Sequence, residues 1–131
     1  MSTEETIAAL KSYRPTVGTA PQEFVQRASV VAWNDERHVE DTRERYRRKR
    51  EVLIPVLERK GYRIAASAAT MYLWVAVCEP AEHVAARLLE YGIVISPGTF
   101  FGPSGEGYVR FALVPTLEEC KRAAALLEDA L

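Results

Sequence analysis

The sequence has few of the residues that build metal centres and disulfides. Its two cysteines, Cys78 and Cys120, lie far apart and form no Cys-x-x-Cys pair, and its two histidines, His38 and His83, are not at metal-ligand spacing. Buried small hydrophobes are the better interpretation of the cysteines, because nothing in the pattern suits a zinc site or a disulfide framework. We expect no metal, and no catalytic triad around either histidine.

The chain also lacks a surplus of one charge and any long apolar run. Seventeen basic and eighteen acidic residues give a net charge of −1, so no overall field attracts nucleic acid or an anionic membrane. The basic run 43–50 is interrupted by Glu44, which favours a solvated helix face over nucleic-acid binding. No apolar run approaches the roughly 20 residues of a membrane span, and the first ten residues lack a secretion pattern. We therefore expect a cytoplasmic protein with neither a membrane nor a nucleic-acid partner.

The first part of the sequence has helical periodicity. Apolar spacing predicts helices over 3–13 and from Pro21 to a boundary near 34–35, then a long charged helix over 36–60. A proline inside this last segment, Pro55, predicts a kink or a restart there. The first 35 residues contain no strand to pack against, so we interpret them as part of a larger domain.

The remainder of the sequence alternates extended and helical segments. One helix is predicted to open at Glu79-Pro80 and to end near Tyr91. The final helix begins after Thr116, a predicted cap with Glu119 as its partner. Aromatic and β-branched residues predict four strands, over 62–66, 70–78, 93–96 and 108–114. The order β-β-α-β-β-α favours an α+β fold, in which helices cover a small mixed or antiparallel sheet.

Arg110 is the residue that most strongly suggests a ligand, because it interrupts an otherwise apolar strand. A guanidinium in that setting lowers stability unless it is paired, and its planar fork suits a carboxylate. We predict that Arg110 faces a cleft and binds the carboxylate of an amino acid or keto acid. The alternative is an arginine on the exposed face of an edge strand, shared with Tyr108 and Ala112.

A glycine-rich turn over 98–107 precedes this strand. Its glycine spacing matches neither Gly-x-Gly-x-x-Gly nor a Gly-Lys-Ser/Thr loop, and no helix begins where a phosphate would sit. We interpret it as a flexible turn that lets the backbone approach a ligand or a neighbouring domain.

Three motifs in this region, IVISPG, FG and GEGYVRF, follow one another over 93–111. Together they resemble the C-terminal portion of class I/II aminotransferases, the pyridoxal-phosphate enzymes of fold type I. The basic run 45–50 and the strand 71–74 support the resemblance, which covers nearly the whole chain. Segments 20–26 and 101–107 look most like succinyldiaminopimelate-type transaminases, which would imply a role in lysine biosynthesis.

The resemblance implies roles for particular residues. Arg110 would bind the α-carboxylate of the substrate, and the loop carrying Gly98, Phe101 and Gly102 would border the entrance of the active site. Residues 1–35 would be the incomplete tail of the large cofactor-binding domain, and residues 36–131 the C-terminal small domain. Because the first segment packs near the subunit interface in the family, the resemblance also implies an exposed apolar face, self-association and a homodimer.

This chain has no counterpart of the Schiff-base lysine that the family requires. None of the four lysines, Lys11, Lys49, Lys60 and Lys121, lies in the setting in which the family places its Schiff-base lysine. We therefore expect a C-terminal fragment that neither binds pyridoxal phosphate covalently nor transfers amino groups without the missing N-terminal half or a partner subunit. The alternatives are a non-catalytic module that binds an amino acid, a carboxylate or a partner, and a structural remnant that binds nothing.

Overall fold

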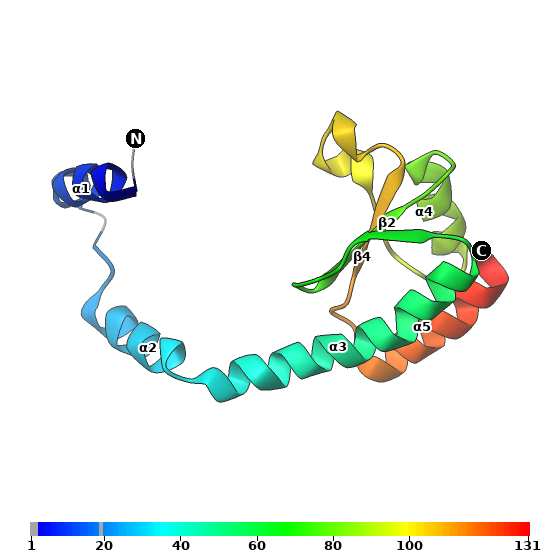
Figure 1. The fold of residues 1–131 in the computed structure, drawn as a ribbon, viewed down its shortest axis with the longest axis horizontal. Coiled ribbons are helices and arrows are strands. Elements are labelled where there is room, and N and C mark those ends of the chain that lie inside the picture. The colour runs from blue at the N-terminus through cyan, green and yellow to red at the C-terminus, as the bar shows by residue number, and fades with distance from the viewer. Residues whose placement is uncertain (1–2, 19) are drawn as a thin grey trace. The chain divides into compact units, whose positions relative to one another are not determined.

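The computed structural model describes residues 3–18 and 20–131, and it contains an α+β fold (Figure 1). The chain divides into two compact units, Met1–Val39 and Glu40–Leu131. Met1, Ser2 and Thr19 lie outside the described residues, so expectations for these positions remain predictions. None of the helices in the described ranges is long and apolar enough to cross a membrane.

The first unit is helical, as predicted. It contains α1 (Thr3–Tyr13), the short 3₁₀ helix η1 (Arg14–Val17) and α2 (Glu23–Trp33). No described residue of these three elements is buried, and the indole of Trp33 is 84% exposed. The exposed apolar face is therefore confirmed. The assignment of this segment to a larger cofactor-binding domain, and its self-association, remain predictions.

Helix α3 (Glu36–Arg59) begins at the predicted boundary, where the side chain of Asp35 accepts a hydrogen bond from the backbone N–H of Arg37 (3.1 Å). The helix continues through Pro55 without interruption, so the predicted restart is wrong. Pro55 lies on the exposed side of the helix, where water can satisfy the carbonyl that loses its donor. The helix ends at Arg59, and Gly61 follows it with a φ of 84°, which suits glycine.

The sheet consists of four antiparallel strands, in the order β1-β2-β4-β3. Two of them, β1 (Arg63–Ala66) and β2 (Tyr72–Ala76), form a hairpin, and β4 (Tyr108–Ala112) lies between β2 and β3. The alternative in which Arg110 lies on an edge strand is therefore wrong, because β4 is paired on both sides. Strand β3 covers only Ser96–Pro97 rather than 93–96. One reason is that the N–H of Ile93 donates to the carbonyl of Leu88 (2.9 Å), which closes the preceding helix instead of extending the sheet.

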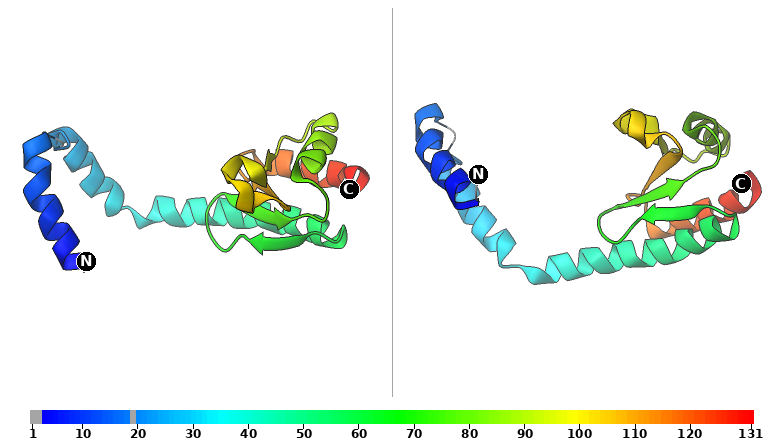
Figure 2. Two further views of the ribbon diagram at one scale, coloured as in Figure 1. Left: turned by 90° about the horizontal axis from the view of Figure 1, so that it is seen from above. Right: turned by 45° about the horizontal axis from the view of Figure 1, so that its top comes forward.

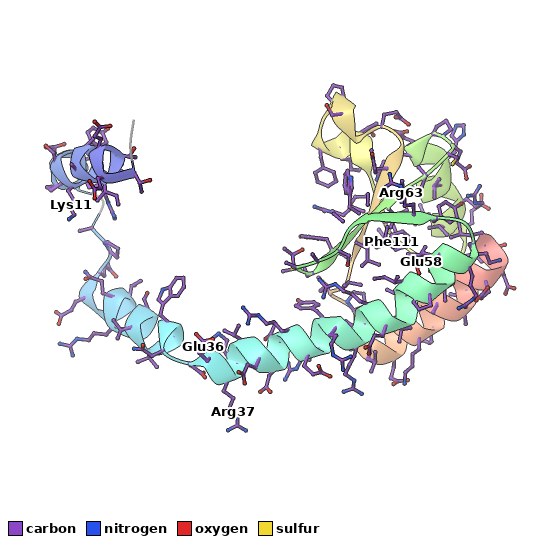
Figure 3. All side chains as sticks on the ribbon, in the orientation of Figure 1. Lys11, Glu36, Arg37, Glu58, Arg63 and Phe111 are labelled. Atoms are coloured by element: carbon purple, nitrogen blue, oxygen red, sulfur yellow. The ribbon has the colours of Figure 1, made fainter. Side chains whose placement is uncertain are left out.

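Helices α3, α4 (Ala81–Glu90) and α5 (Leu117–Ala130) supply the other half of the core. Figure 2 shows α3 and α5 side by side against the sheet, and Figure 3 labels Phe111, which points toward them from β4. Alternate residues of β2 and β4 and one side of each helix form the cluster, including Leu53, Leu57, Leu73, Val75, Val84, Leu88, Val109, Phe111 and Leu127. The core therefore occupies one face of the sheet and leaves the other face for different contacts.

Two smaller expectations have different outcomes. Thr116 and Glu119 form the predicted capping box at the start of α5, since each side chain accepts from the other residue's backbone N–H. Cys120 is buried as expected, at 2% exposure, whereas Cys78 is exposed, so its interpretation as a buried hydrophobe is wrong. Cys78 follows β2 at a turn, where its side chain is outside the core.

Candidate carboxylate-binding site

Arg110 lies in the middle of β4, on the face of the sheet opposite the core. Its partners across the neighbouring strands are Trp74 in β2 and Ser96 in β3. Alternation along the strand sends the adjacent residues Val109 and Phe111 into the core, where they are 1% and 6% exposed. The strand register therefore gives the guanidinium neighbours on both sides, which an edge strand would not provide.

Aromatic rings and one hydroxyl surround the guanidinium. The Cζ atom of Arg110 is 4.3 Å from the ring centroid of Tyr72 and 4.2 Å from that of Phe101. Its Nη2 atom is 3.5 Å from the Ser96 hydroxyl oxygen, at the outer limit of a hydrogen bond. Its Nε atom is buried and has no hydrogen-bond partner among the described residues. No carboxylate of residues 3–18 or 20–131 forms an ion pair with it, so donors of this cation remain free.

The loop that carries Phe101 is compact because two glycines are in contact. It consists of the 3₁₀ helices η2 (Gly98–Phe101) and η3 (Pro103–Gly105). A Cβ atom added at Gly98 would lie 2.0 Å from the carbonyl oxygen of Gly105, and one added at Gly105 would lie 2.0 Å from that of Gly98. The glycines thus let the backbone approach itself, whereas the sequence suggested an approach to a ligand or domain. Gly102, between the two turns, has a φ of 118° that favours glycine.

Contacts with α4 also hold the loop. The hydroxyl of Thr99 donates a hydrogen bond to the carboxylate of Glu82. The carboxylate of Glu106 accepts from the backbone N–H groups of Ala81 (3.4 Å) and Gly107 (3.1 Å). These contacts connect both ends of the loop to the start of α4. They fix the place of Phe101 relative to the sheet.

The hydrogen bond from Thr99 lowers the pKa of the Glu82 carboxyl below its usual value. A lowered pKa in the folded protein means that the bond contributes stability at neutral pH, which is lost as the pH falls through the lowered pKa. We expect the backbone amide resonances of Thr99 and Phe101 to shift in NMR spectra as the pH falls below the ordinary pKa of a glutamate carboxyl. In Glu82→Gln, which cannot ionise, these pH-dependent shifts should be absent. Equal shifts in both proteins would contradict this assignment.

The aromatic residues around Arg110 belong to one cluster. Trp74 stacks on Tyr108, with ring centroids 5.6 Å apart and planes inclined by 16°, and it meets Phe101 edge to face at 5.8 Å. The sequence did not identify Tyr72, Trp74 and Ser96 as neighbours of Arg110. The period-2 alternation of β2 could have placed both aromatic residues on one face, but the β2–β4 register was needed to bring them to Arg110.

A separate cavity of about 390 Å³ lies between α5 and the segment before β3. Its lining is mostly apolar and includes Val94 and Leu126, with Glu119 and Arg122 among its polar residues. Arg110 is not part of this lining. Within the described ranges, no group of three or more His, Cys, Asp or Glu residues could hold a metal ion.

Nearly the whole sequence matches the protein class that the motifs at 93–111 indicated. Residues 1–127 match the family model for aminotransferase class I and II. The chain therefore belongs to the class I/II aminotransferase family.

Individual relatives agree with this family. The chain is 40% identical over 121 residues to the 4-dedimethylamino-4-oxo-anhydrotetracycline transaminase OxyQ of Streptomyces rimosus, covering 92% of this chain and 34% of that protein. It is 36% identical over 130 residues to the LL-diaminopimelate aminotransferase of Aquifex aeolicus, covering 96% and 34%. The structure of a probable N-succinyldiaminopimelate aminotransferase from Thermus thermophilus superposes with a TM-score of 0.82 at 32% identity, covering 100% of this chain and 36% of that one. The chain thus spans about a third of the length of these relatives.

The lysines of this chain do not fit covalent attachment of the family's cofactor, pyridoxal phosphate. The amine of Lys49 donates to the carbonyl of Leu113 (2.8 Å), and that of Lys60 donates to the carbonyl of Glu128. Lys121 pairs with Glu118 (2.8 Å), and Lys11 lies exposed on α1. A Schiff-base lysine needs an amine that is free to react within a pocket, and none of these positions provides both.

Proposed function

We propose that this chain supplies the substrate-carboxylate site of an aminotransferase, with Arg110 as the group that binds the carboxylate. The observation that carries the proposal is that the guanidinium of Arg110 is held between aromatic rings, on the face of the sheet opposite the core, with N–H donors that have no partner in the described part of the chain. Planar N–H pairs of a guanidinium match the two oxygens of a carboxylate, so a bound acid would be fixed in both position and plane.

The reaction we propose for the complete enzyme is transfer of an amino group between an amino acid and a 2-oxo acid. Diaminopimelate or its succinyl derivative is the proposed substrate type, since relatives named for these substrates are 36% and 32% identical to this chain. Pyridoxal phosphate supplies the electron sink for this chemistry. This chain's part is to hold the substrate so that the bond to be broken is correctly oriented.

We further propose that the chain does not transfer amino groups by itself, because its lysines do not fit the cofactor. The family's Schiff-base lysine would come from another part of the enzyme or from a homodimer partner. An absorbance scan of the purified chain with pyridoxal phosphate should give no visible band that survives dialysis. A dialysis-resistant band would show that one of the four lysines attaches the cofactor after all.

The carboxylate site can be tested by following side-chain N–H signals of the purified chain in NMR titrations with 2-oxoglutarate. We expect the Nε–H signal of Arg110 to shift with saturation in wild type. Binding by the variants is followed through the indole N–H signal of Trp74, which they all retain. Arg110→Ala should weaken binding by roughly 100-fold, because two hydrogen bonds to a charged group are lost. Arg110→Lys keeps the charge but loses the planar fork, so it should weaken binding by roughly 10-fold.

Arg63, an exposed arginine on β1 of the same sheet, provides the matched control. Arg63→Ala should leave the titration unchanged. The proposal is contradicted if wild-type Arg110 does not respond to 2-oxoglutarate, or if Arg63→Ala weakens binding as much as Arg110→Ala does.

A further inference from the structure

We infer that Phe101 and Tyr72 are positioning residues, which hold the guanidinium of Arg110 ready for a carboxylate; this inference rests on the proposed function. Both ring centroids lie within 4.3 Å of the Arg110 Cζ atom, well inside the distance at which a ring attracts a cation. The two rings come from different elements, β2 and η2, so the cation is held by the sheet and by the loop.

Aromatic contacts, unlike an ion pair, leave the N–H donors of Arg110 available to a ligand. An acidic partner would use the in-plane N–H groups of Arg110, which are the same groups that a substrate carboxylate needs. A ring attracts the cation through its electron-rich face and accepts none of those in-plane hydrogen bonds. The arrangement therefore fixes the guanidinium while its donors stay free, apart from the long contact to Ser96 (3.5 Å).

The rings are themselves held in place. Tyr72 is fixed by strand pairing, opposite Ala112 of β4. Phe101 is 52% exposed, but Trp74 supports it edge to face, and the turn that carries it is held by the Gly98–Gly105 contact. Phe101 is therefore the position at which the loop acts on the arginine.

The adjacent residue, Phe100, provides a matched control for Phe101. It belongs to the same 3₁₀ helix and is 75% exposed, and none of the described ring contacts involves it. Substitutions at 100 and 101 remove the same ring from neighbouring positions. Only the change at 101 should affect Arg110.

The test uses the full chain and two NMR readouts. Protons held over a ring face resonate upfield, so the Nε–H signal of Arg110 should move downfield in Phe101→Leu and Tyr72→Leu. In a titration with 2-oxoglutarate, both variants should bind roughly 3- to 10-fold more weakly than wild type. Phe101→Tyr and Tyr72→Phe keep the rings and should restore both readouts, and Phe100→Leu should change neither.

The possible results separate this inference from the proposed function. If wild-type Arg110 binds 2-oxoglutarate but neither readout responds to Phe101→Leu and Tyr72→Leu, the positioning role is wrong and the carboxylate site stands. The same conclusion follows if Phe100→Leu weakens binding as much as Phe101→Leu. If the Nε–H signal responds to Phe101→Leu but 2-oxoglutarate does not bind wild type, the carboxylate role is wrong, and the positioning role is overturned with it.

Discussion

Leu88→Ala is expected to lower the free energy of unfolding by about 2–5 kcal/mol, as large-to-small substitutions do in a close-packed core. Leu88 lies in α4, is fully buried and belongs to the cluster that joins the helices to the sheet. Removing most of its side chain would take buried apolar surface out of the core and leave a cavity among its former neighbours. Urea denaturation of the full chain, followed by circular dichroism, would measure the change.

The next residue in the same helix provides the control. Leu89 is 59% exposed, so Leu89→Ala removes the same atoms from the solvent-facing side of α4 and should change stability by about 0.5 kcal/mol or less. Two variants of equal stability would contradict the assignment of Leu88, and not Leu89, to the core.

Gly98→Ala is expected to displace the loop over Arg110 and to lower stability by about 1–3 kcal/mol, the usual range for overpacking. The added methyl group would lie 2.0 Å from the carbonyl oxygen of Gly105 and 2.7 Å from that of Tyr108. Both obstacles are backbone atoms, so no side-chain rotation can relieve the clash. We expect weaker 2-oxoglutarate binding in the NMR titration, because the displaced loop carries Phe101 with it.

Two further variants test the cause of this effect. Gly105→Ala meets the same contact from the other side and should reproduce the result, and the two changes together should cost less than their sum. Ser104→Ala changes an exposed residue of the same loop and should be neutral. A Gly98→Ala variant that folded and bound 2-oxoglutarate like wild type would contradict the prediction, because the loop would then tolerate a wider separation of Gly98 and Gly105.

The sequence was sufficient to predict the α+β class and the order of the elements, since these depend on local periodicity and capping. Thr116 and Glu119 illustrate this point, because a capping box involves residues only three positions apart. The failures concern long-range pairing. Strand 108–112 lies inside the sheet because β3 pairs with it, and β3 itself is short because Ile93 bonds back to the end of α4.

The candidate site was predictable in part for the same reason. Arg110 could be identified from the sequence, because a charged residue is unusual within an otherwise apolar strand. Its neighbours could not, because Tyr72 and Trp74 reach it through strand register, and Phe101 reaches it through the contact between two glycines seven residues apart. Sequence patterns specify which residues share a strand face, but the pairing of strands decides which of them meet.

The different settings of the two cysteines make them usable as chemical reporters. Cys78 is exposed, so a maleimide can label the native chain at that position. Cys120 lies on the buried side of α5, and burial raises the pKa of its thiol, which keeps less of it in the reactive thiolate form. The rate at which a second label is incorporated would therefore report how often α5 separates from the sheet, without adding any foreign residue to the chain.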